Sequence, residues 1–157
     1  MPRSPFAAIA LACALFGATQ ARADDMSFSG FANGYQTVNV ALSAPNATLS
    51  ELAYAGGLLA TLGSGASFTT YCADLYEPVD FGTIYPEYNV VDGASHAFAN
   101  SSANGDIGKL YAEANVVNDA TTQAAFQIAI WEIAYETSGS YDLSTGSAQF
   151  TGGTADS

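Results

Sequence analysis

Cys72 and Gln127 are the two side chains of this chain best suited to covalent chemistry. Cys72 lies in the segment Thr-Thr-Tyr-Cys-Ala-Asp-Leu of residues 69–75, and Gln127 lies in the segment Phe-Gln-Ile-Ala-Ile-Trp-Glu of residues 126–132. If the fold brings them together, the Cys72 sulfur can attack the Gln127 carboxamide, displace ammonia and leave an internal thioester. Such a bond reacts once with an incoming nucleophile, so the pair predicts covalent attachment rather than catalytic turnover.

Gln127 is expected on the apolar face of a helix, where a side-chain amide needs an explanation. The helical spacing of apolar residues predicts this helix over residues 120–136. A buried amide that finds no hydrogen-bond partner costs about 1–3 kcal/mol. The structural alternative is a Gln127 amide bonded to nearby backbone or to Tyr71, and Gln123, one turn earlier, competes as the partner of Cys72. The spacing alone does not choose among these interpretations.

The rest of the sequence predicts the elements that would position this pair. Short apolar or alternating stretches between Gly, Ser, Thr and Asn predict strands in the first half. These strands are expected at residues 26–31, 35–42, 48–52, 53–62, 68–75 and 88–91. Helical spacing predicts a first helix over residues 106–114, and the second follows Asp119 or Thr121 as its N-cap. The expected fold class is therefore α+β and β-rich, with sandwich or barrel strands in the first half and two short helices in the second.

The N-terminus has the pattern of a secretory signal peptide. Arg3 precedes an uncharged apolar run over residues 6–17, and an Ala-Arg-Ala sequence that signal peptidase accepts ends at Ala23. The apolar run is shorter than the roughly 20 residues that span a bilayer, so we expect no membrane insertion of the mature domain. The expected organisation is a signal peptide at residues 1–23, one thioester-like domain at residues 24–140, and a linker or incomplete C-terminal edge at residues 141–157.

Removal of the signal peptide changes both the cysteine count and the charge. It removes Cys13 and leaves Cys72 as the only cysteine of an exported chain, a setting in which cysteines normally pair. It also removes Arg3 and Arg22, which leaves Lys109 as the only basic residue against fifteen acidic ones, a net charge of −14. Because counterion release requires Lys and Arg contacts, this balance excludes nucleic acid as a partner.

Two other kinds of site have less support in the sequence. His96, the only histidine, is a candidate base for Cys72 in a cysteine hydrolase, but the residues flanking Cys72 match no hydrolase signature. A metal site would have to use scattered carboxylates, and no closely spaced calcium-loop pattern occurs. These carboxylates belong to Asp74, Glu77, Asp80, Asp92 and Asp106. We therefore expect no metal and no cofactor.

The segments that contain Cys72 and Gln127 resemble the two signatures of bacterial surface thioester domains. The matching sequences are Tyr-Cys-Ala-Asp at residues 71–74 and Gln-Ile-Ala-Ile-Trp at residues 127–131. The resemblance selects Gln127 over Gln123 and implies a thioester-domain-like fold. One position departs from the family pattern, because Phe126 stands where threonine commonly precedes the glutamine.

A second resemblance concerns export and sorting. The signal peptide, the Cys72 segment, the Asp-Phe-Gly of residues 80–82 and the helix segment of residues 125–136 are together similar to exported proteins of Gram-negative bacteria that carry a PEP-CTERM sorting tail. The resemblance implies secretion or attachment at the cell surface. Residues 152–157 carry no such tail, so the chain is expected to be a fragment of a longer precursor.

The resemblance also implies how a thioester would act. An amine on a partner protein or glycan surface would attack the former Gln127 carbonyl, form an amide and release Cys72, which gives adhesion or attachment to extracellular matrix. The side chains expected around the bond are Tyr71, Asp74, Phe126, Ile130 and Trp131, with His96 as a candidate for assisting proton transfer. The alternative from another class is a noncovalent structural component of extracellular matrix, in which Cys72 and Gln127 are simply packed.

Overall fold

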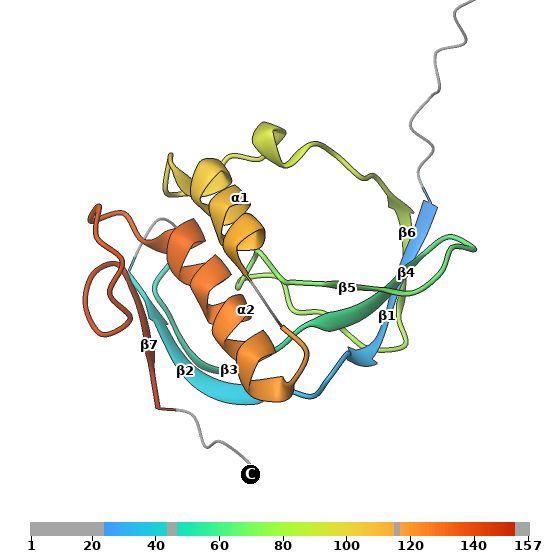
Figure 1. Ribbon diagram of the computed structural model, residues 1–157, viewed down its shortest axis with the longest axis horizontal. Coiled ribbons are helices and arrows are strands. Elements are labelled where there is room, and N and C mark those ends of the chain that lie inside the picture. Colours follow the sequence, from blue (N-terminus) through green and yellow to red (C-terminus); the bar gives the residue numbers. More distant parts are fainter. Residues whose placement is uncertain (1–23, 44–46, 115–116, 153–157) are drawn as a thin grey trace, which may run out of the picture.

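The computed structural model describes residues 24–43, 47–114 and 117–152, so the predicted signal peptide and Cys13 lie outside the described residues. Figure 1 shows strands gathered in two sheets beside two helices. The elements are β1 (Asp24–Phe31), β2 (Gln36–Leu42), β3 (Leu49–Ala55), β4 (Leu58–Leu62), β5 (Phe68–Thr70), β6 (Ile84–Tyr88), a 3-10 helix η1 (Gly93–Ser95), α1 (Ala103–Glu113), α2 (Ala120–Tyr135) and β7 (Ala148–Thr151). This arrangement confirms the β-rich α+β fold class.

The strands form two antiparallel sheets, one with the order β5-β4-β1-β6 and the other with the order β3-β2-β7. Helix α2 packs across the three-stranded sheet, and α1 lies beside α2 on the side away from that sheet (Figure 1). Along β2, Val38, Val40 and Leu42 are buried at alternate positions, as expected for a strand with one face on a core. On the same core, the Trp131 ring of α2 stacks on Phe150 of β7 with centroids 6.2 Å apart.

Each sheet has its own hydrophobic core, and Cys72 packs against both. The larger core lies between α2 and the three-stranded sheet. The smaller one is formed by Met26, Phe28, Leu58 and Ala60 of the four-stranded sheet. Because β5 ends at Thr70, the Cys72 segment leaves the sheet and runs between the two cores. The predicted strand over residues 68–75 is therefore correct only in its first three residues.

Two glycines set the boundary between β3 and β4. A Cβ at Gly56 would lie 2.7 Å from the Gly34 carbonyl oxygen, and one at Gly57 would lie 2.8 Å from Gln123 Oε1. Neither position has room for a larger residue without movement of its neighbours. The turn therefore falls at Gly56-Gly57, between the end of β3 and the start of β4. The predicted boundary between residues 52 and 53 is wrong because these close approaches come from residues distant in the sequence.

The largest difference from the sequence analysis is β7, which lies in a segment predicted to be a linker or an incomplete edge. Residues 148–151 pair with β2 and bury Ala148 and Phe150. Four residues among Gly, Ser and Thr are too few to show a strand period, so only the tertiary pairing reveals them. Helix α1 also begins three residues earlier than predicted, at Ala103, and β6 lies at Ile84–Tyr88 rather than at residues 88–91.

Candidate functional site

The structure places the Gln127 side chain directly against the backbone of Cys72. The Cys72 N–H donates to Gln127 Oε1 at 2.8 Å, and Gln127 Nε2 donates to the Cys72 carbonyl at 2.7 Å. Only 1% of Gln127 is exposed, and Cys72 is half-buried. The two bonds fix which end of the amide carries oxygen, because a backbone N–H can only donate and a carbonyl can only accept. The carboxamide carbon is therefore held beside residue 72.

Helix α2 supplies Gln127 because its start is firmly defined. The Asp119 carboxylate accepts the Thr122 N–H at 2.9 Å, and the Thr122 hydroxyl accepts the Asp119 N–H at 3.3 Å. This reciprocal capping box satisfies two of the free donors at a helix start. Of the two predicted N-caps, Asp119 and Thr121, the structure uses Asp119. Gln127 then lies two turns into the helix, on a face that meets the Cys72 segment.

Tyr135 fastens the same segment to α2 a second time. Its hydroxyl donates to Asp74 Oδ1 at 3.0 Å and accepts the Leu75 N–H at 3.1 Å. Tyr135 lies eight positions after Gln127, a rise of about 12 Å along α2. The Cys72 segment is thus bonded to α2 at two points, Gln127 and Tyr135, which restricts movement of Cys72 relative to Gln127. Sequence reasoning missed this role because a tyrosine on an apolar helix face has the pattern of a core residue.

The Cys72 thiol lies in a partly desolvated environment. Burial raises the pKa of the thiol, whereas a backbone hydrogen bond from Asp74 and the Trp131 indole lower it. The nearby carboxylates of Asp74 and Glu77 raise it again. In its neutral form the thiol donates to the Asp74 carbonyl, with Sγ and the oxygen 3.0 Å apart. Nε1 of Trp131 is buried and makes no hydrogen bond within the described part of the chain. The net effect favours the neutral thiol.

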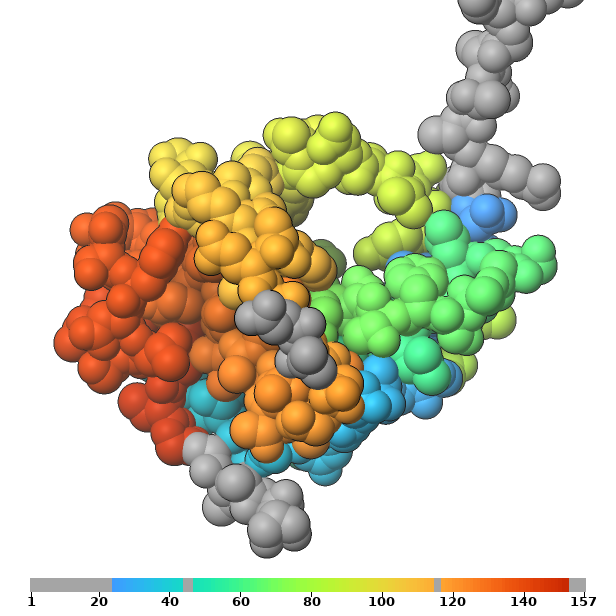
Figure 2. Space-filling view, viewed as in Figure 1, coloured from blue at the N-terminus to red at the C-terminus, as the bar shows by residue number. Residues whose placement is uncertain are grey.

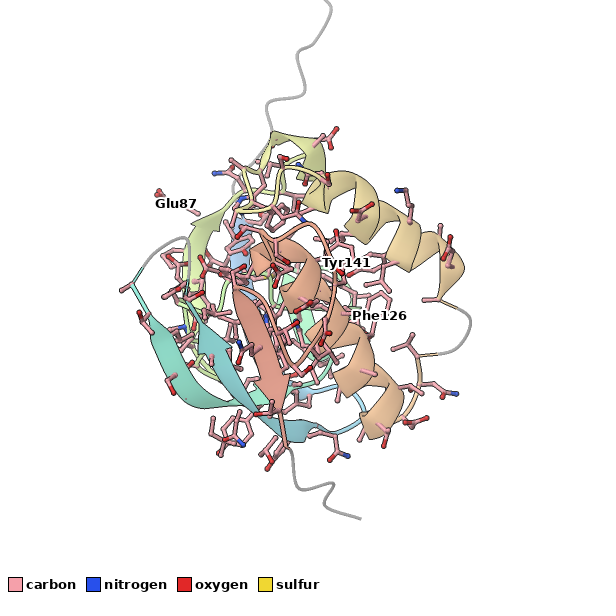
Figure 3. The ribbon with its side chains drawn as sticks, turned by 90° about the vertical axis from the view of Figure 1, so that its left-hand side faces the viewer. Glu87, Phe126 and Tyr141 are labelled. Atoms are coloured by element: carbon pink, nitrogen blue, oxygen red, sulfur yellow. The ribbon has the colours of Figure 1, made fainter. Side chains whose placement is uncertain are left out.

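Tyr71 and Phe126 form an aromatic group next to this pair. The Phe126 ring lies 4.8 Å from Tyr71 and 4.9 Å from Tyr111 of α1, centroid to centroid. Figure 3 shows Phe126 on the side of α2 that faces α1. Phe126 thereby joins the Cys72 segment to both helices.

Three other residues singled out in the sequence lie in different settings. Ile130 is buried, but it is not among the residues that line the cavities beside Cys72. His96 is exposed, and its ring packs on Phe98 with centroids 4.4 Å apart, without a hydrogen bond to Cys72 among the described contacts. Gln123, the competing partner, accepts a hydrogen bond from the Gly57 N–H at 3.3 Å instead.

Two cavities open beside Cys72. The first has a volume of about 450 Å³ and is lined by Cys72, Gln127 and Trp131 together with residues of β3 and of the 74–81 segment. The second, of about 390 Å³, is lined by Cys72 and His96 but not by Gln127. Figure 2 shows the molecule hollowed between the segment around η1 and the four-stranded sheet, on the side of this second cavity. A reagent that must reach the Gln127 carbonyl would therefore use the first cavity.

Glu136 is a buried carboxylate that the sequence did not single out. Burial alone would raise its pKa. Hydrogen bonds from the backbone and side chain of Ser138, the Ala148 N–H and the Ser147 hydroxyl lower it by more than burial raises it, so the net pKa falls below its usual value. Glu136 also accepts the Ser147 N–H at 2.9 Å. These contacts tie the end of α2 to the start of β7. Its role is structural, and a glutamate on a helix face gives no sequence signal for it.

Comparisons of the chain with known protein families, with characterised proteins and with solved structures find no match. Within the described ranges, no helix is both long enough and apolar enough to cross a membrane. Across those same ranges, no group of three or more His, Cys, Asp or Glu side chains is placed to hold a metal ion.

Proposed function

We propose that this is a secreted surface or matrix protein that carries an internal thioester between Cys72 and Gln127 and uses it to attach covalently to amine groups of a partner protein or glycan. The single observation that carries the proposal is the pair of hydrogen bonds, 2.8 and 2.7 Å long, between the Gln127 amide and the Cys72 backbone. They hold a carboxamide against the backbone of the residue that carries the thiol, although the two residues lie far apart in the chain.

These hydrogen bonds also suit the chemistry of thioester formation. When Cys72 Sγ attacks the Gln127 carbonyl carbon, negative charge develops on Oε1, and the Cys72 N–H already donates to that oxygen. The carbon–nitrogen bond then breaks, the thiol proton passes to the leaving nitrogen, and ammonia departs. Attack by a neutral thiol is slow, but it has to succeed only once per molecule, and proximity replaces strong activation.

Burial supports a long-lived product. Gln127 and Trp131 are 1% and 3% exposed, so bulk water has little access to the carbonyl carbon from the helix side. The acceptor amine would reach the carbonyl from the 450 Å³ cavity, attack it, and release the Cys72 thiol. The new amide links the partner to Gln127.

The noncovalent alternative has one observation in its favour. Both polar ends of the Gln127 amide are hydrogen-bonded, so the residue needs no covalent bond to explain its burial. In that case Cys72 and Gln127 would only tie the Cys72 segment to α2 in a structural matrix protein.

Intact mass spectrometry of the purified protein, combined with alkylation under native conditions, separates the two. We expect a species one ammonia lighter than the sequence, with Cys72 resistant to alkylation until methylamine is added and one methylamine gained as the thiol becomes free. Cys72→Ser should show the full mass, whereas Gln123→Ala, which leaves the Cys72–Gln127 contact in place, should still lose ammonia. Full mass and no methylamine uptake in the unsubstituted protein would leave the noncovalent matrix role.

A further inference from the structure

We infer that the acceptor amine belongs to a lysine on an extended, basic polypeptide segment that binds as an added strand along the free edge of β3. The covalent step rests on the proposed thioester, whereas the docking step does not. Three features of the described residues carry the inference: an unpaired strand edge, a cavity that follows this edge to Gln127, and acidic side chains along the cavity.

The outer edge of β3 has unpaired backbone groups. Residues of an antiparallel strand hydrogen-bond alternately to one neighbour and to the other. Ser43, just after β2, donates its N–H to the Ser147 carbonyl on the β7 side at 2.9 Å, so Leu42 and Val40 bond toward β3. Their partners are Leu49 and Glu51.

Ser50, Leu52 and Tyr54 therefore direct their N–H and C=O groups away from β2. Among the described residues, none of these groups makes a hydrogen bond to another part of the chain. An edge of this kind is a template for one more strand, and adding an extended peptide to it is a known mode of recognition.

The first of the two cavities beside Cys72, the one that Gln127 also lines, runs along this edge of β3. It is lined by five residues of β3, Leu49 and Glu51 to Tyr54. Successive side chains of a strand point to opposite faces of the sheet, so a cavity that touches both sets lies along the edge rather than on one face. The opposite wall is the 74–79 segment, and the buried pair of Gln127 and Trp131 lies at its inner end. An added strand would lie roughly 4.8 Å from β3, within this space.

Charge indicates a basic partner. Glu51, Asp74 and Glu77 line the cavity, and no Lys, Arg or His is among its lining residues. Leu52 and Tyr54, at 54% and 56% exposure, offer apolar surface to the side chains of a bound strand. A second copy of this strongly acidic chain would meet like charge at the same place and is disfavoured.

The acylation step then balances without a cofactor. The lysine ammonium gives one proton to solvent, and its free amine attacks the Gln127 carbonyl carbon. The carbon–sulfur bond breaks, the amine loses its second proton, and Cys72 Sγ takes up one proton as it leaves as a thiol. The products are an amide between Gln127 and the lysine, and free Cys72.

The test compares a docking substrate with one that cannot dock. The docking probe is an acetylated and amidated peptide of alternating lysine and valine, and the small probe is methylamine; adduct formation with each is followed by intact mass. Leu52→Pro removes the outward N–H, a change that edge strands tolerate, and Leu52→Ala keeps that N–H while removing the side chain. We expect Leu52→Pro to slow the peptide reaction on the order of tenfold, the effect of losing one main-chain hydrogen bond, with methylamine unaffected.

Leu52→Ala should retain most of the peptide rate. Glu77→Gln should slow the peptide but not methylamine, while the control Glu113→Gln, exposed on α1, should change neither. Equal peptide rates in Leu52→Pro and the unsubstituted protein would overturn the inference. If methylamine does not react at all, the proposed thioester fails, and docking is then judged from noncovalent binding of the peptide to Cys72→Ser and to Cys72→Ser with Leu52→Pro. Equal affinity of those two proteins would also overturn it.

Discussion

Opening the proposed thioester should lower the stability of the protein by an amount that follows from its position in the chain. A covalent bond between Cys72 and Gln127 joins residues 55 positions apart. In the chain-entropy treatment of cross-links, closing such a loop restricts the unfolded state and contributes about 4 kcal/mol. The thioester has no Nε2 donor, so one hydrogen bond to the Cys72 carbonyl is absent while the bond exists, which offsets about 1 kcal/mol. The net stabilisation is about 3 kcal/mol.

Differential scanning calorimetry before and after methylamine treatment measures this quantity. An unfolding entropy of about 2.1 cal/mol/K per residue converts about 3 kcal/mol into a fall in Tm of about 10 °C. Cys72→Ser, which never forms the bond, should match the methylamine-treated protein and should not respond to methylamine. If mass spectrometry shows full methylamine uptake and Tm stays constant or rises, the loop-closure reasoning is refuted even though the thioester exists.

Three further substitutions test separate parts of the structure. Trp131→Phe removes the indole that favours the thiolate, so the pKa of Cys72 should rise further and alkylation of the methylamine-opened protein should slow at pH 8. Gly146→Ala should lower the free energy of unfolding by about 2–4 kcal/mol in urea titrations, because a Cβ there would overlap the Glu136 carboxylate and the residue has φ +94°. Glu132→Gln should raise the free energy of unfolding relative to the parent protein more at pH 8 than at pH 4, because burial raises the pKa of Glu132. The charges of Glu136 and Asp142 add to this rise, and a hydrogen bond from the Asp142 N–H opposes it.

The sign of the Glu132 prediction follows from linkage. A carboxyl with a raised pKa in the folded state binds its proton more tightly there, so its contribution is present below the unfolded pKa and is lost as pH rises through the folded value. For Gly146, the control is Gly105→Ala, where a Cβ meets nothing within 4 Å and the helix should gain stability. Equal alkylation rates in Trp131→Phe and the parent protein would contradict the role given to the indole.

The sequence predicted the fold class and most elements because their signals are local. Alternating burial in β2 and the capping residue Asp119 at the start of α2 both act within a few residues. It missed β7 because a four-residue strand has no detectable period, and its stability comes from pairing with β2 and from the Glu136 carboxylate. The turn at Gly56-Gly57 was misplaced for a similar reason, since contacts with Gly34 and Gln123 determine it.

By itself, the sequence determined the chemistry that is available: one cysteine in residues 24–157, two candidate glutamines one helical turn apart, and fifteen acidic residues against a single lysine in that range. Spacing alone left both glutamines open and the resemblance favoured Gln127, but only the tertiary structure shows what packs opposite each of them. Gln127 faces the Cys72 backbone, and Gln123 faces Gly57. Contacts across 55 residues of chain depend on how α2 lies between the two sheets, and no local spacing encodes that placement.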